Sequence, residues 1–117
     1  MTKVAIVIYS KLEGAGKSAV YRALMFADEL MRGGDDVTIV FDGAGSTALA
    51  DVLDPANSLH RTWLKAASAL RGVCAYCAKS YGVHEALTSA GIPMLTEDKG
   101  HASLRGLLLE GRQIITF

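Results

Sequence analysis

Short apolar runs alternate along this chain with longer stretches in which apolar residues return every three or four positions. The run at residues 4–9, VAIVIY, is continuous and mostly β-branched, which is typical of a strand that helices cover on both faces. Four later runs are shorter. Together these runs predict five strands, at residues 3–9, 37–41, 72–75, 92–95 and 113–117.

The stretches between these runs predict helices. From Lys17 onward apolar side chains fall on one helical face, and Gly33 and Gly34 end that helix. Ser58 is expected to cap a helix whose inner face includes Trp63. Further helices are predicted at residues 47–53, 85–90 and 103–109.

Strands and helices in alternation require a mostly parallel sheet with helices on both faces. We therefore expect an α/β fold, a three-layer α/β/α sandwich around a mostly parallel five-stranded sheet, with flavodoxin-like or Rossmann-like layering. The 117 residues suffice for a single domain, at residues 1–117. Ligands gather at the carboxyl ends of such strands. Residues 10–16, 42–43, 74–77 and 96–100 all follow predicted strands and would share one rim.

Charge and hydropathy narrow the class of protein. The chain has 12 Lys plus Arg and 12 Asp plus Glu, with no block of like charge, which argues against direct nucleic-acid binding. No apolar run reaches the length of a membrane span, so no membrane association is expected. The first residues lack the layout of a secretory signal, and the expected location is the cytoplasm.

The only two cysteines lie three positions apart, in VCAYCAK at residues 73–79, where a short strand leads into a helix. A thiol at that junction can accept hydrogen bonds from free backbone N–H groups and sense the positive end of the helix dipole, and both favour the thiolate. Cys74 and Cys77 could therefore attack a sulfur donor, carry a sulfur atom or close a disulfide. The competing interpretation is two small apolar core residues.

Three neighbours of the pair are candidate assisting residues. Lys79 would lower the thiol pKa together with the helix N-terminus, His84 could exchange a proton with a thiol, and Tyr76 could shape a pocket. A zinc site needs four ligands, or three with an open position. The cysteines could supply two, with His84 and His101 as further candidates. No second CxxC or HxxxH pair occurs, so no metal is predicted.

A glycine-rich segment after the first strand imitates a phosphate-binding loop. The Walker pattern GxxxxGK[ST] ends here at Gly16, Lys17 and Ser18, but Lys11 replaces its first glycine, and the chain is short for such an NTPase. A dinucleotide pattern, GxGxx(G/A), begins at Gly14, too far after the strand. Neither an NTPase nor a cofactor is predicted. Gly14, Gly16, Lys17 and Ser18 remain a candidate site for a small anion.

A thioredoxin-like oxidoreductase is the main chemical competitor. In that fold the CxxC follows the first strand and is usually flanked by Trp and Gly-Pro. Here it follows the third predicted strand and reads Cys-Ala-Tyr-Cys. Its position argues against a thioredoxin.

The segment at residues 73–83, VCAYCAKSYGV, resembles the cysteine loop of DsrE/DsrF-like proteins, in which VCxxCAKxxG variants are common. The likeness includes the opening strand, the first helix ending in Gly-Gly before a VTIV-type strand, and the final GRQIITF. It implies an α/β/α domain with a five-stranded parallel sheet that assembles into trimers or hexamers. In the TusD-like branch the active cysteine lies eight residues before the loop glycine, which selects Cys74 relative to Gly82.

The resemblance implies a cytosolic sulfur carrier or a sulfurtransferase-type relay protein. Cys74 would accept sulfane sulfur as a persulfide, and Cys77 would assist or resolve it. Its partners would be sulfur donor and acceptor proteins and further copies of the chain. The alternative is a non-catalytic oligomeric module that binds a small anion or a nucleotide at the rim of strand exits.

Overall fold

The computed structural model describes all residues, 1–117, and forms an α/β fold. Its strands are β1 (Lys3–Ile8), β2 (Asp36–Phe41), β3 (Leu70–Cys74), β4 (Met94–Leu95) and β5 (Gln113–Thr116). Its helices are α1 (Ala15–Arg32), α2 (Gly45–Val52), α3 (His60–Ala66), α4 (Ala75–Ser80), α5 (His84–Ser89) and α6 (Leu104–Leu109), with a 3-10 turn at Ala67–Ala69. The five strands predicted from the apolar runs are all confirmed.

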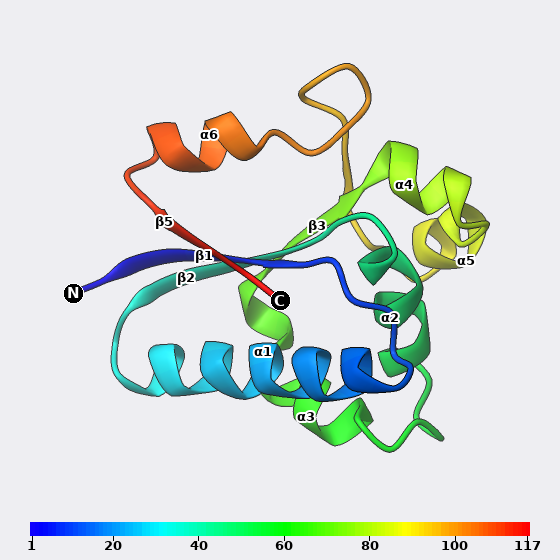
Figure 1. Cartoon of the computed structure of the whole chain (residues 1–117), viewed down its shortest axis with the longest axis horizontal. Coiled ribbons are helices and arrows are strands. Elements are labelled where there is room, and N and C mark those ends of the chain that lie inside the picture. Colours follow the sequence, from blue (N-terminus) through cyan, green and yellow to red (C-terminus); the bar gives the residue numbers. More distant parts are fainter.

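All five strands are parallel and form one sheet in the order β4-β3-β2-β1-β5. From β1 to β4 the chain moves in one direction across the sheet, and it then returns to add β5 beyond β1. Right-handed crossovers place the connecting helices on one face for the first direction and on the other face for the return. Figure 1 shows this arrangement, with α6 above the sheet and α1 and α3 below it.

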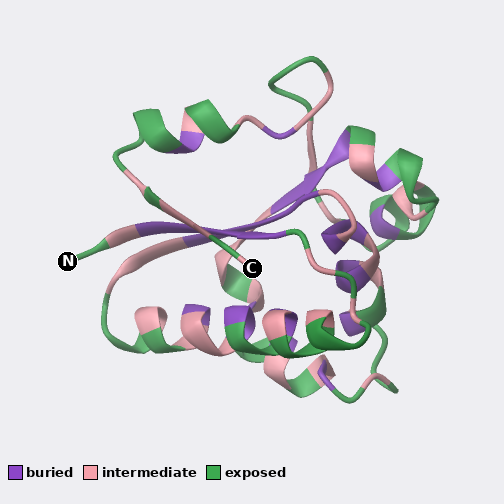
Figure 2. Cartoon of the chain, viewed as in Figure 1, coloured by how far each residue is buried: buried purple, intermediate pink, exposed green.

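The two faces of the sheet are packed very differently. One face carries a cluster of 18 buried residues, in which helices α1, α2 and α3 contribute side chains such as Leu24, Leu49 and Trp63. The opposite face carries only six: Ala5, Val7, Val40, Cys74, Ala102 and Leu107. Leu107 is the one buried residue of α6, which is otherwise mostly exposed, as Figure 2 shows. Cys74 therefore lies on the thinly covered face.

The observed elements differ from the predicted ones mainly at their ends. β3 begins at Leu70 rather than at residue 72, and β4 is only two residues long. The expectation that Ser58 caps α3 is wrong. Leu59 occupies the N-cap position, and its amide donates to the side-chain oxygen of Asn57 at 2.9 Å, so Asn57 closes the turn instead. None of the helices combines the length and apolar character needed to cross a bilayer.

An ion-pair network holds the amino ends of the strands. The Arg112 guanidinium donates to the carbonyls of Val4 and Asp36 at 3.2 and 3.3 Å and to the Asp36 carboxylate at 3.0 Å. Glu110 accepts from both Arg71 and Arg112, which together lower its pKa to about 2, with Arg71 as the larger cause. The opposite, carboxyl ends of the strands remain free to carry polar side chains.

Candidate functional site

The carboxyl ends of β2 and β3 bring an acid and a thiol together. Phe41 of β2 is paired with Val73 of β3 in the parallel register, so the next residues, Asp42 and Cys74, leave the sheet side by side. Cys74 is fully buried, and Asp42 is buried as well. The predicted rim of strand exits is thus confirmed at these two positions.

The helix after β3 returns the second thiol to the same point. Cys77 lies in the first turn of α4 and is half-buried. Its S–H donates to Oδ1 of Asp42 at 3.3 Å. The Sγ atoms of Cys74 and Cys77 lie within 4.8 Å of each other, and both cysteines are free thiols. The pair is therefore close enough to exchange a sulfur atom after a small movement.

A histidine from a loop distant in sequence completes the group. Nδ1 of His101 lies 3.4 Å from Sγ of Cys74. The loop at residues 96–103 follows β4, and Leu95 of β4 is the pairing partner of Cys74. The pairing of β3 with β4 therefore places this loop, including His101, beside the buried thiol of Cys74.

Backbone contacts fix the orientation of this loop. Asp98 and His101 exchange two backbone hydrogen bonds of 2.9 and 2.8 Å, and Lys99 between them has φ 53°. The carbonyl of Gly100 accepts from the amide of Tyr76 at 3.0 Å. The Tyr76 ring also lies against the His101 imidazole, with ring centroids 4.4 Å apart. His101 is thus held in place on both sides before any ligand arrives.

The thiol of Cys74 does not cap the helix, contrary to the expectation from sequence. Cys74 occupies the N-cap position of α4, but no side chain caps that helix. The amide of Tyr76 is used by Gly100 instead. No backbone amide therefore donates to the Cys74 sulfur through a cap, and the polar atom beside it is Nδ1 of His101.

The two thiols have different surroundings. Burial first, and then hydrogen bonds to Cys74 and to the Asp42 carboxylate, raise the pKa of Cys77 to about 12 against an opposing contribution from the Gly43 amide. Such a thiol is protonated at neutral pH. The pKa of Tyr9, which follows β1, is also raised, first by burial and then by the charge of Asp42. Cys77 therefore acts as a hydrogen-bond donor, while Cys74 faces a base.

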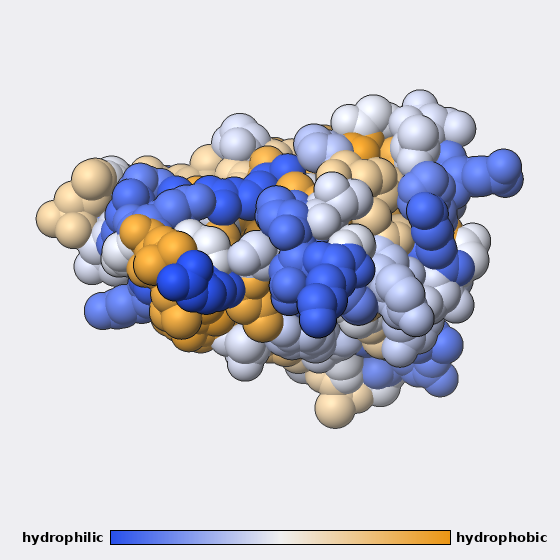
Figure 3. Space-filling model, turned by 90° about the horizontal axis from the view of Figure 1, so that it is seen from above, coloured by the Kyte–Doolittle hydropathy of each residue, from blue (hydrophilic) through white to orange (hydrophobic).

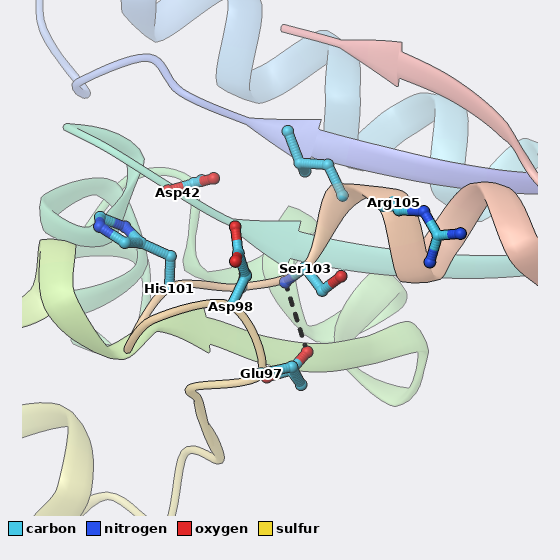
Figure 4. A pocket seen from close by; sticks show the side chains of 8 residues that line it. Asp42, Glu97, Asp98, His101, Ser103 and Arg105 are labelled. Carbon is cyan, nitrogen blue, oxygen red and sulfur yellow. Dashed lines mark hydrogen bonds between the residues drawn. The ribbon is translucent and has the colours of Figure 1, made fainter.

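A polar cavity of about 500 Å³ opens beside the thiols. Asp42 and His101, which contact the two sulfur atoms, form part of its wall. Figure 4 shows these two residues at one end of the cavity and Arg105 at the other. The wall also includes Glu97, Asp98, Ala102, Ser103 and Leu104. Three carboxylates against one arginine make the cavity more favourable to cations than to anions.

The predicted assisting residues fall in different places. Tyr76 contacts the group through the His101 ring. His84 begins α5 and lines a separate hollow, and it forms no hydrogen bond with either thiol. Lys79 is exposed on α4 and forms no ion pair. The structure brings His101 rather than His84 to Cys74, because the pairing of β3 with β4 outweighs closeness along the chain.

In the glycine-rich segment, the backbone conformation and close packing of the turn explain Gly14 and Gly16. Gly14 has φ 57°, and a Cβ on Gly16 would lie 2.1 Å from the carbonyl oxygen of Lys11. The amides of Gly16 and Lys17 already donate to carbonyls of the same turn, while Lys17 and Ser18 are exposed. Anion binding at Gly14, Gly16, Lys17 and Ser18 stays a prediction.

Two roles were not assigned from the sequence: Asp42 as the acceptor of the Cys77 thiol, and His101 as the partner of Cys74. The available signal was position after a strand, since Asp42 directly follows β2 and His101 lies in the loop after β4.

Cys74, Cys77 and His101 are also the three side chains able to hold a metal ion together, with two sulfurs and one nitrogen as donors.

Comparison with known proteins supports the fold alone. No protein-family model matches this chain, and no curated protein does. Among solved structures the chain is similar to a conserved protein of unknown function from Bacteroides thetaiotaomicron, with a TM-score of 0.69 and 18% identity. The match covers 98% of this chain and 95% of that one.

Proposed function

We propose that this protein carries sulfane sulfur as a persulfide on Cys74, as the resemblance of its cysteine loop to DsrE-like sulfur-relay proteins implies. The observation that carries the proposal is the 3.4 Å contact between Cys74 Sγ and His101 Nδ1, with the Cys77 thiol close by. A thiolate is the nucleophile in each thiol–disulfide type of exchange, and an adjacent imidazole is a suitable acceptor for the thiol proton.

Loading begins when His101 takes the proton of Cys74. The Cys74 thiolate attacks the terminal sulfur of a donor persulfide, forming a new S–S bond as the S–S bond of the donor breaks. The donor leaves as a thiolate and takes up a proton, and the protein holds Cys74–S–SH. Cys77 does not compete for the donor, because its raised pKa keeps it protonated.

Discharge uses an acceptor protein or Cys77. In the second route, Asp42 takes the proton of Cys77 and the Cys77 thiolate attacks Sγ of the persulfidated Cys74. A Cys74–Cys77 disulfide forms as the outer S–S bond breaks, and the outer sulfur takes up that proton and leaves as hydrogen sulfide. Asp42, which accepts the hydrogen bond of the Cys77 thiol, orients it for this step. An external thiol must then reduce the disulfide, which fits the cytoplasm as the compartment in which the cycle runs.

Access to Cys74 requires a local movement. Its side chain is fully buried, and the cavity beside it ends at His101 and Asp42. We propose that the half-exposed Tyr76 ring moves, while His101, whose backbone is paired with that of Asp98, stays beside Cys74. The alternative of an anion-binding module gains no support from this cavity, because Asp42, Glu97 and Asp98 would repel an anion.

A Cys77→Ser variant tests the proposed division of roles. After one exposure to a sulfane donor, the wild type should form a persulfide that decays to a disulfide and releases hydrogen sulfide. The variant should accumulate the persulfide and release little sulfide, because no second thiol is present to discharge it. Intact mass spectrometry and a sulfide-selective electrode measure the two products.

A Ser80→Ala variant serves as the control, since Ser80 is exposed at the end of the same helix and forms no hydrogen bond with either thiol. It should behave as the wild type does. Equal release of sulfide from the Cys77→Ser variant and the wild type would remove Cys77 from the reaction.

We also propose a homo-oligomer, a trimer or hexamer, in which α6 contributes to the contact between copies. Leu104, Leu108 and Leu109 leave much of their surface exposed on this helix. Figure 3 looks down on this face and shows hydrophobic side chains gathered at one end among charged ones. Burying such surface between copies is favourable by about 25 cal/mol per Å².

Replacing both Leu108 and Leu109 with glutamate should dissociate the oligomer, because the charges would have to be buried without partners. The control is Leu64→Glu on α3, because Leu64 is equally exposed, at 58% compared with 59% for Leu108, but lies on another surface. Light scattering gives the assembly mass of each protein. A wild type that scatters as a 12.4 kDa monomer would contradict the proposal.

A further inference from the structure

We propose that Cys74, Cys77 and His101 form a binding site for a thiophilic divalent cation, with Zn²⁺ as the reference ion. The two Sγ atoms and one imidazole nitrogen lie within 4.8 Å of one another, in the absence of any disulfide. The proposal concerns binding in its own right and goes beyond the carriage of sulfur.

The distances agree with those of a coordination shell. With usual Zn–S and Zn–N bonds and tetrahedral angles, a sulfur and a nitrogen ligand lie about 3.6 Å apart and two sulfur ligands about 3.8 Å apart. Cys74 Sγ and His101 Nδ1 are 3.4 Å apart, and the remaining separations are at most 4.8 Å. A movement of Cys77 within the first turn of α4 is sufficient to complete the three-ligand geometry.

The donor set determines the kind of ion. Two thiolates and one imidazole suit zinc and other soft or borderline cations, whereas calcium and magnesium prefer oxygen ligands. Three protein ligands leave a fourth position open for water, as in catalytic zinc sites. Asp42 already accepts a hydrogen bond from Cys77, so its carboxylate is placed to act as an outer-shell group beside the ion.

The surroundings favour entry of a cation. The cavity that ends at Asp42 and His101 is lined by Glu97 and Asp98 as well, which attract positive charge. The His101 ring is already oriented by Tyr76 and by the paired backbone of Asp98. Ion binding therefore costs little conformational entropy at this residue. Both thiols release their protons when the ion binds, so the two positive charges of the ion replace those of the two protons and the net charge of the site is unchanged.

Metal binding and sulfur transfer use the same sulfur atoms. An ion on Cys74 and Cys77 occupies the lone pairs that would attack a persulfide, so the metal-loaded protein is blocked toward sulfur donors. This consequence rests on the proposed function, whereas the site itself does not.

The test uses Co²⁺ as a spectroscopic substitute in the reduced, metal-free, full-length protein with no sulfur donor present. We expect one Co²⁺ per chain, with intense sulfur-to-cobalt charge-transfer absorption in the near ultraviolet and visible bands typical of tetrahedral cobalt. Added Zn²⁺ should displace the cobalt and abolish both the charge-transfer absorption and the visible cobalt bands. Because no donor is present, this result is independent of whether the protein can carry sulfur.

Variants assign the ligands. Cys74→Ser and Cys77→Ser should each reduce the charge-transfer absorption, and His101→Ala should weaken Zn²⁺ affinity by at least about 10- to 100-fold, the usual loss for outer-shell partners alone. The matched control is His84→Ala, since His84 lies in a separate hollow on α5 and should leave the affinity unchanged.

The wild type alone provides a second measurement if a variant fails to fold. Zn²⁺ should slow the alkylation of both thiols in the native protein, and a chelator should restore the original rate. Absence of the charge-transfer band, or alkylation at the same rate with and without Zn²⁺, would overturn the proposal. Unchanged affinity in His101→Ala would also overturn it as stated, because the third ligand would be wrong.

Discussion

A Cys74→Ser variant should lose all uptake of sulfur from a sulfane donor and keep its fold. Serine preserves the size of the side chain, but an alcohol forms no persulfide. Its hydroxyl can still form a hydrogen bond with His101 Nδ1, so the polar contact of the buried position is retained. Intact mass spectrometry after incubation with the donor should show the mass of the unmodified chain alone.

The Cys77→Ser variant is the matched control for this result, because it removes the other thiol of the same pair and should still gain sulfur. Circular dichroism on both variants establishes that the sheet and helices are intact. Sulfur uptake by Cys74→Ser together with its loss in Cys77→Ser would mean that the roles of the two thiols are reversed.

Replacing Phe41 with alanine should destabilise the protein by about 3–5 kcal/mol. Phe41 is fully buried at the end of β2 and lies edge-on to Trp63, with ring centroids 5.9 Å apart. Its removal loses the transfer free energy of the ring, the aromatic contact and the packing around the resulting cavity. Since small domains have a free energy of unfolding of about 5–15 kcal/mol, urea denaturation should begin at much lower concentration.

Leu64→Ala is the control for this prediction. Leu64 lies on α3, the helix that also carries Trp63, but its side chain is 58% exposed, so the change should stay within about 0.5 kcal/mol. If Phe41→Ala and Leu64→Ala lowered the free energy of unfolding by similar amounts, the cluster around Phe41 would not be the main core.

The strands and their common rim could be predicted because burial on both faces leaves a continuous apolar run. This holds for β1 and β2, where Val4, Ile6 and Val40 are all buried as the pattern requires. The direction of the sheet follows from alternation with helices. The sequence pattern does not predict that helices bury one face of the sheet much more than the other. This difference depends on the return of the chain to β5 and on the short length of α6.

The cysteine pair of the site could be predicted from the sequence, but its histidine could not. Cys74 and Cys77 lie three positions apart at a strand exit, so local structure alone brings them together. His101 meets Cys74 through the pairing of two-residue β4 with β3, followed by an irregular loop with Lys99 at positive φ. Neither of those features has a periodic signal, and closeness along the chain pointed to His84 instead.

Peptide mapping after brief sulfur loading shows whether Cys74 accepts sulfane sulfur in the native protein. Reduced, metal-free wild type is incubated with a persulfide donor, trapped with an alkylating agent and digested. We expect one added sulfur atom per chain, found on Cys74 while Cys77 is alkylated as a plain thiol. If the protein gains no sulfur, and its two thiols resist alkylation until it is denatured, then Cys74 carries no sulfur and the cysteine pair is structural.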